Sequence, residues 1–228
     1  MTPAIVTLPL DLMVQSVVDW DIEWRGAPDM QTIAGGTVSV VNQMPRWIGR
    51  PSLVLTEALI ARWRAIRWAA RGRVNVYRVQ MFDPLVRSRG SFSGASAAFR
   101  AGLAFSTGAR FSTGSGFAYA PFVLAHAAAA GAEEIEVTVP DGGVVPGLGQ
   151  IMSHDDRPFG VTSVTALGGA EYRLTVEMPL RAAIPEGGIV NHIGTGLFKA
   201  DSDAMGQAAY GPMKVAQPQL SFVEYLNR

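Results

Sequence analysis

The sequence predicts a mainly β protein with one flanking α-helix and a small inserted all-β domain. The strands are predicted by runs in which apolar and polar residues alternate, with Gly-rich turns between them. Residues 56–71 instead repeat their apolar side chains at helical spacing. Because 48% of the 228 residues are hydrophobic, the chain can bury the core of one large domain or of two small ones.

The region before the helix is expected to be rich in strands. Within it, Trp20 and Ile22 alternate with Asp21 and Glu23, which is typical of a half-buried strand. Pro51 favours an edge strand or an irregular path. We expect strands in four segments, three before the helix and one after it: residues 17–24, 33–41, 47–55 and 74–82.

The helix over residues 56–71 has clear start and stop signals. Thr56 suits the N-cap position, and Gly72 can end the helix. One apolar stripe is expected to face the core, and it consists of Leu59, Trp63, Ile66 and Ala70. At about 100° per residue, a second group shares the face away from that stripe: Ile60, Arg64, Arg67, Trp68 and Arg71.

The second face is a candidate contact between subunits or between domains. Trp and Arg are over-represented at protein contacts, and the three arginines are neighbours on the helix surface. Two alternatives remain open: a solvated basic face with one stray tryptophan, and a contact with a DNA backbone.

Residues 83–121 differ in composition, because Gly, Ser, Ala and Thr dominate there. Loops of this length are usually functional or only partly ordered, and aromatic residues are depleted in disordered segments. We interpret the segment as an extended arm that orders against a partner, with packing on its own domain as the alternative. The candidate contact residues are its regularly spaced phenylalanines: Phe92, Phe99, Phe105 and Phe111.

The remaining chain predicts a small β-barrel-like domain over residues 122–195. Apolar and polar residues alternate in 134–139 and again in 171–177, and short strands with Gly-rich turns suggest a small barrel or sandwich. Residues 196–228 are expected to return to the first domain, residues 1–121, through a last strand.

Charge and composition exclude several classes of protein. Lys plus Arg equals Asp plus Glu at 19 each, which argues against a dedicated nucleic-acid binder. The chain has no cysteine, so disulfides and thiolate metal sites are excluded. The first twelve residues fit neither a signal peptide nor a membrane span, so we expect no membrane partner.

The sequence offers no set of residues from which to build a catalytic, metal or cofactor site. The three histidines do not share a metal-ligand spacing, and His154-Asp155-Asp156 is interpreted as a solvated turn. Asp201-Ser202-Asp203 lacks the glycine and glutamate of a calcium loop. For Ser93 and Ser96, the sequence identifies no His and Asp partners of a catalytic triad. We therefore expect no enzyme activity, no cofactor and no metal.

Three stretches together match the pattern of a known family. The first includes Gln43-Met44-Pro45-Arg46-Trp47, the helix with Glu57 and Trp63, and a strand ending in Asp83-Pro84. The second is the small-residue segment that follows. The third and most specific includes Ala130-Gly131-Ala132, Pro146-Gly147-Leu148-Gly149, Met178-Pro179-Leu180-Arg181, Ile184-Pro185-Glu186-Gly187 and Phe222-Val223-Glu224. The chain thus resembles distal tail and minor tail proteins of siphophages and of gene transfer agents. It departs from the pattern at Leu148, where an Asp is usual after Pro-Gly.

The resemblance implies a structural virion protein of a long non-contractile tail. It implies a tail-tube-like β-sandwich or barrel in the first domain, and a ring, usually a hexamer, that joins the tail tube protein to the baseplate hub protein. DNA would only pass through the channel. The site would be the virion tail tip, with assembly in the host cytoplasm and without a cofactor. The alternatives are a tail tube or hub subunit, a host carbohydrate-binding module at residues 122–195, and a cell-wall enzyme.

Overall fold

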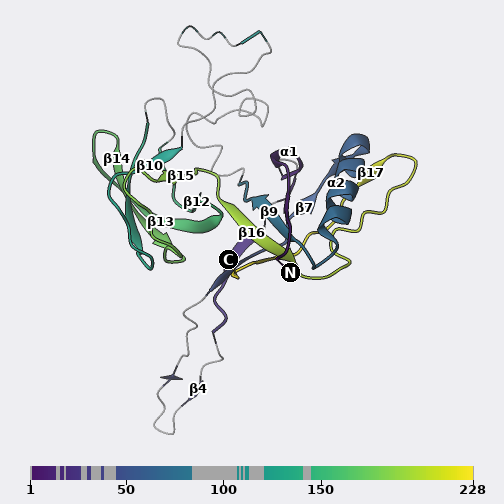
Figure 1. Cartoon of the computed structure of the whole chain (residues 1–228), viewed down its shortest axis with the longest axis horizontal. Helices are drawn as coiled ribbons and strands as arrows, with labels where there is room; N and C mark the ends of the chain where they lie inside the picture. Colours follow the sequence, from purple (N-terminus) through teal and green to yellow (C-terminus); the bar gives the residue numbers. More distant parts are fainter. Residues whose placement is uncertain are drawn as a thin grey trace. The chain divides into compact units, whose positions relative to one another are not determined.

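A computed structural model describes the chain over residues 2–13, 16–17, 19–26, 30–31, 37–38, 45–83, 107, 109, 111–112, 121–140 and 145–227. It confirms a mainly β protein (Figure 1). Helix α2 (Glu57–Ala70) is the one helix longer than a single turn in these residues. The predicted arm lies almost wholly outside them, as do Phe92, Phe99 and Phe105.

The chain divides into two compact units. Unit 1 comprises Met1–Leu8, Gln15–Arg78 and Leu197–Arg228, and unit 2 comprises Pro9–Val14 and Val79–Gly196. Unit 2 also includes the short helix α1 (Leu10–Met13). Independent folding of residues 122–195 stays a prediction.

One six-stranded mixed sheet is formed by segments from both ends and the middle of the chain. Its strands, in spatial order, are β1 (Ile5–Thr7), β9 (Val76–Gln80), β16 (Thr195–Ala200), β18 (Phe222–Glu224), β6 (Arg46–Gly49) and β3 (Trp20–Glu23). β1 is parallel to β9, whereas β18 is antiparallel to both β16 and β6. The last strand of the chain is therefore central to this sheet, and β1 and β3 are its edges.

Aromatic side chains fill the core beside this sheet. Trp20 stacks on Phe222, with ring centroids 6.2 Å apart and planes 9° apart, and lies 5.0 Å from Phe198. Tyr77 meets Phe222 edge-on at 5.4 Å. Gly49 pairs with Trp20, and a Cβ at this glycine would lie 2.2 Å from the indole ring. The glycine therefore lets the indole lie directly against the backbone of β6.

Three two-stranded pairs complete the strands of the first unit. They are β2 (Ser16–Val17) with β7 (Ser52–Leu53), β4 (Met30–Gln31) with β5 (Thr37–Val38), and β8 (Leu55–Thr56) with β17 (Val215–Ala216). The β8–β17 pair joins the start of α2 to the C-terminal region.

The strands of unit 2 form a nearly closed barrel-like sheet, as expected. Their order is β12 (Ile151–His154), β13 (Arg157–Gly168), β14 (Glu171–Glu177), β11 (Glu134–Thr138), β10 (Phe122–Leu124) and β15 (Ile189–Val190). A bridge between Ser153 and Asn191 brings the two end strands together. The alternation predicted in β11 and β14 is confirmed, because Ile135, Leu174 and Val176 are buried.

The predicted phase of α2 is partly wrong. Trp63 and Ala70 are buried as expected, whereas Leu59 and Ile66 are only half-buried. Ile60 was placed on the outward face, yet it is 3% exposed. The buried stripe is turned toward Ile60 because residues 203–216 cover that side of the helix.

Candidate interaction surface on helix α2

The segment 203–216 runs antiparallel along α2, and Figure 1 shows this yellow segment beside the helix. From the start of the helix to its end, the numbers of the partner residues fall overall, from 214 near Glu57 to 205 near Arg67. The hydrogen bonds that show this are Lys214 Nζ to Glu57, Trp63 Nε1 to Gly206 O (2.8 Å), Arg64 Nη1 to Tyr210 Oη (2.8 Å) and Arg67 Nε to Met205 O (2.8 Å). The surface around the helix is therefore made by two distant segments of the chain.

The C-terminal end of α2 is fixed by the same segment. Arg71 is the C-cap in the left-handed region (φ 51°), and Gly72 follows with φ 62°. Asp203 Oδ1 accepts hydrogen bonds from Arg73 N (3.0 Å) and Arg73 Nε (3.4 Å), which lower the pKa of Asp203. A Cβ at Gly72 would lie 2.6 Å from Asp203 Oδ1, so glycine is required there for steric as well as conformational reasons.

The structure distributes the five predicted face residues over three environments. Trp68 is 63% exposed, and Arg64 and Arg71 are exposed beside it. Arg67 is half-buried, because its guanidinium also donates to the carbonyl of Asp203 at 3.2 Å. Ile60 belongs to the core and is removed from the candidate surface. Phe111, from the predicted arm, is described and is 45% exposed.

Two exposed residues of the C-terminal segment extend this surface and were missed from the sequence. Arg64 lies between Trp68 and Tyr210, because its Cζ is 4.9 Å from the Trp68 ring centroid and it donates to the Tyr210 hydroxyl. Met213, three residues further on, is 88% exposed. No sequence pattern links positions about 140 residues apart. We define the α2 surface as Arg64, Trp68, Arg71, Tyr210 and Met213.

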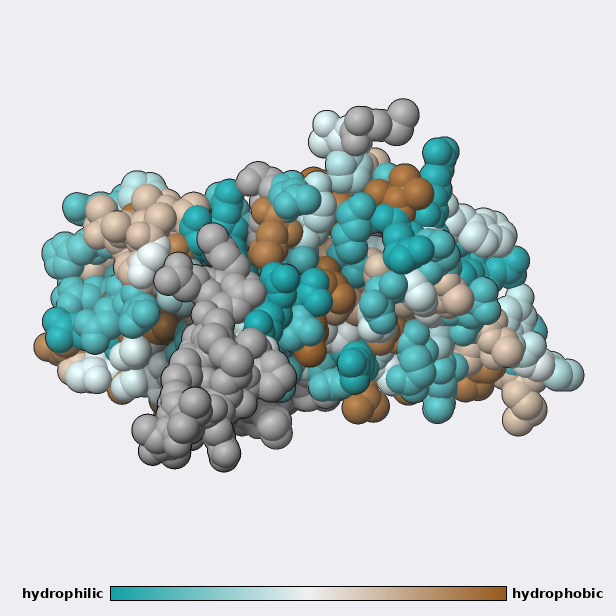
Figure 2. Space-filling model, turned by 90° about the horizontal axis from the view of Figure 1, so that it is seen from below, coloured by the Kyte–Doolittle hydropathy of each residue, from teal (hydrophilic) through white to brown (hydrophobic). Residues whose placement is uncertain are grey.

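Exposed apolar side chains alone do not mark this surface as a binding site. On the face seen in Figure 2, the coloured hydrophobic residues stand singly or in small groups among hydrophilic ones, which is ordinary for a protein surface. The distinguishing feature is the contact of Arg64 with two aromatic side chains, Trp68 and Tyr210. The attraction between a guanidinium and an exposed aromatic ring is worth about 0.5–1 kcal/mol. The same guanidinium can still form forked hydrogen bonds with a carboxylate.

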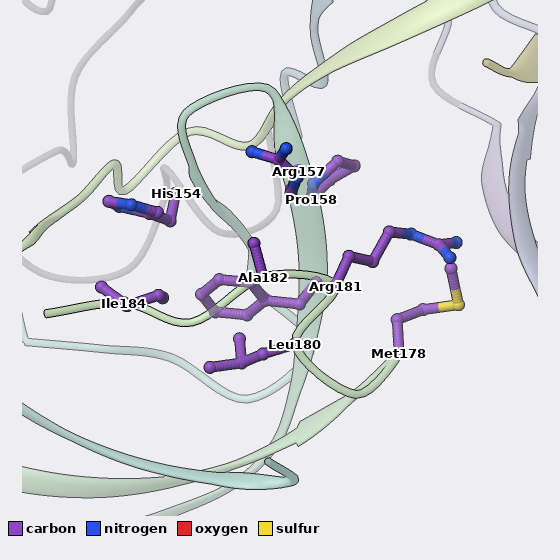
Figure 3. A pocket seen from close by; sticks show the side chains of 9 residues that line it. His154, Arg157, Pro158, Met178, Leu180, Arg181, Ala182 and Ile184 are labelled. Atoms are coloured by element: carbon purple, nitrogen blue, oxygen red, sulfur yellow. The ribbon is translucent and has the colours of Figure 1, made fainter. Parts of the chain in front are cut away.

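A small pocket in the barrel of unit 2 provides the second candidate site (Figure 3). Its volume is about 10 Å³, which holds roughly one water molecule. Its basic groups do not converge, since Arg181 extends toward Met178 and away from His154 (Figure 3). His154 Nδ1 is already 2.8 Å from the Ile189 carbonyl. The pocket is therefore too small and too divergent for a sugar or an anionic ligand.

Some charged groups of the barrel pair with one another on its surface. Arg173 donates from Nε and Nη2 to Glu136 Oε1 at 3.0 and 2.7 Å, and His126 Nε2 lies 3.6 Å from Glu136 Oε2. These bonds raise the pKa of Arg173. Asp155 occupies the turn between β12 and β13 with φ 51°, as expected for a turn at His154-Asp155-Asp156. Arg173, Glu136 and His126 are therefore accounted for as a surface cluster of opposite charges.

Within the part of the chain that the structure describes, no three His, Cys, Asp or Glu side chains are grouped so as to hold a metal ion. No helix there is long and apolar enough to cross a membrane. No protein-family model matches the chain, and no curated protein matches it. A function for this chain therefore has to be argued from its own residues and contacts.

Proposed function

We propose that the protein is a structural component of a long non-contractile phage tail. In this proposal it is a distal tail protein that forms a ring, a hexamer in the usual case, between the tail tube protein and the baseplate hub protein. DNA passes through the channel of the ring. The protein acts at the virion tail tip after assembly in the host cytoplasm, and it is not an enzyme.

The proposal is carried by hydrogen bonds between residues of the motifs that resemble the tail-protein family. Glu224, in the last stretch, is buried and accepts the N–H of Trp47, in the first, at 3.0 Å. Leu180 exchanges backbone hydrogen bonds with Gly131 and Ala132 at 2.6 and 3.0 Å. These motif residues, among those that the structure describes, therefore help to build the fold, as expected for a structural protein.

The α2 surface supports assembly with other proteins. It combines an exposed tryptophan, a tyrosine and arginines, the residue types most enriched where proteins meet. A ring repeats each contact at every subunit, so that a modest surface can hold the assembly.

The alternatives differ in what supports them. A tail tube or hub subunit is compatible with the same scaffold and differs only in its position in the particle. The carbohydrate-binding alternative loses support, because Phe159 is buried and Tyr172 is half-buried. Among the described residues, this leaves the barrel without the concave aromatic platform that a sugar site needs.

Electron microscopy of the purified full chain tests the proposal. We expect closed rings with a central opening, with a molar mass of about six subunits by light scattering. A chain that stays monomeric over the whole accessible concentration range contradicts it. Hydrolysis of peptidoglycan by the purified protein, lost on substitution of His126, His154 or His192, also contradicts it.

A further inference from the structure

We infer that the α2 surface binds the β3 edge of a second copy of this chain, head to tail. The β3 edge is defined as Asp19, Asp21 and Trp24, on and beside the last strand of the unit 1 sheet. This inference rests on the proposed function, since it specifies which two surfaces meet in the ring.

The distribution of charge makes a second copy the complementary partner. Residues 57–73 contain five arginines, Arg62, Arg64, Arg67, Arg71 and Arg73, and a single acidic residue, Glu57. Of the 19 basic and 19 acidic residues, 14 and 18 then remain elsewhere, so the rest of the chain has a net charge of −4. Arg73 already pairs with Asp203 of the same copy, whereas Arg64 and Arg71 are exposed, and charge complementarity with acidic groups of another copy favours association.

The β3 edge carries two exposed aspartates, and an exposed indole follows the strand. Asp19 and Asp21 are exposed, and Trp24 is 48% exposed. Glu23 is already engaged, because Arg46 donates to its carboxylate and lowers its pKa. Asp21 Oδ1 accepts only the adjacent Ile22 N–H, at 2.7 Å, among the hydrogen bonds described. The two aspartates therefore retain acceptor oxygens for guanidinium groups.

The backbone of β3 is also available on one side. β3 pairs with β6 and has no second strand partner within the described residues. Edge strands expose unpaired N–H and C=O groups, which natural proteins usually cover or guard with charge. A neighbouring copy docked at Asp19 and Asp21 provides such cover.

The two surfaces lie too far apart in unit 1 to satisfy each other. Helix α2 packs against β1, the opposite edge of the same sheet from β3. Five strand spacings separate these edges, or roughly 24 Å at 4.7–4.9 Å per strand. Each copy can therefore contact one neighbour through α2 and another through β3. Such a contact between unlike surfaces closes into a ring when its rotation permits.

Reciprocal charge reversal tests the contact. We would compare the wild type with Arg64→Glu, Asp21→Lys and the double variant by sedimentation velocity. Each single variant should weaken association by at least about tenfold, as loss of a close charge pair at an interface does. The double variant should recover association, because the pair is restored with exchanged partners. Arg62→Glu is the matched control: it makes the same charge change on the opposite flank of α2.

A second variant separates the contact from folding. Trp68→Ala should weaken association without changing charge, while its circular dichroism spectrum and dilute melting temperature stay those of the wild type. Suppose that wild-type rings form and that none of the variants Arg64→Glu, Asp21→Lys and Trp68→Ala weakens them. The inferred contact is then wrong, but the proposed function stands. If the double variant rescues association and the assemblies are filaments or dimers, the contact stands and the proposed ring is wrong.

The remaining outcomes contradict the contact. A wild type that never associates contradicts both the contact and the ring. Retention of double-stranded DNA by the wild type, lost in Arg64→Glu and unaffected by Asp21→Lys, would show instead that the α2 surface binds nucleic acid.

Discussion

In unit 2 the strands that pair are at most 68 residues apart in the sequence, whereas unit 1 joins segments from both ends of the chain. The hairpin of β13 and β14 turns at Gly168 and Gly169, and β11 pairs with β14 within about 40 residues. In unit 1, β18 pairs with β6, and Arg67 bonds to Met205 across 138 residues. The difference determines which parts of the molecule a sequence pattern can predict.

Strands of the barrel could be predicted because the alternation of apolar and polar residues indicates which side of a strand is buried. β11 and β14 pair residue by residue from Glu134 with Thr175 to Thr138 with Glu171, and each strand carries the same apolar and polar alternation. The turn glycines adopt positive φ angles, as the Gly-Gly pair suggested. The existence of β11 and β14 therefore follows from local residues alone, whereas the short strands β10, β12 and β15 have too few residues for alternation to predict them.

The α2 surface could be predicted only in part. The spacing of apolar residues correctly places Trp63 and Ala70 in the core and leaves Trp68 outside. It misplaces Ile60, because the segment that covers this side of the helix is more than 140 residues away in the sequence. Periodicity shows that a helix has an apolar face, but it does not show which other segment of the chain covers its flank. Tyr210 and Met213 were missed for the same reason.

The largest difference in stability is expected between variants of the two tryptophans of α2. Trp63→Ala should cost about 3–5 kcal/mol, because it empties a buried site and leaves the Gly206 carbonyl without its donor. Trp68→Ala should change stability by no more than about 0.5 kcal/mol in the monomer. Urea unfolding at low protein concentration measures both. Equal losses for the two variants would mean that the buried and exposed faces of α2 are wrongly assigned.

The hydrogen bond between Glu224 in β18 and Trp47 in β6 can be removed by substitution of Glu224. Glu224→Ala should cost about 1–3 kcal/mol, because the buried N–H of Trp47 loses its acceptor. Glu186→Ala, at an exposed position of unit 2, is the control and should be nearly neutral. Thermal melts of the two variants measure the difference. A neutral Glu224→Ala would show that the long-range pairing of unit 1 does not depend on this residue.

A smaller effect is expected at high pH, again in unit 1. Burial raises the pKa of Tyr77 above its ordinary value of 10.0. The neutral phenol is therefore favoured in the folded state, and its contribution is complete below pH 10 and is lost as the pH rises through the folded pKa. The melting temperature of the wild type should fall more steeply above pH 10 than that of Tyr77→Phe. Parallel curves for the two proteins would contradict this account.

Cysteine cross-linking tests whether the α2 surface and the β3 edge meet between copies in a ring. The chain has no cysteine of its own, so Arg64→Cys with Asp21→Cys introduces the only reactive pair. A short bis-maleimide reagent should then give a ladder of covalent oligomers that ends at the ring size, six if the ring is a hexamer. The control pair Arg62→Cys with Asp21→Cys should give little product. Protein that remains monomeric on a denaturing gel after treatment of the Arg64→Cys, Asp21→Cys variant would contradict the claim.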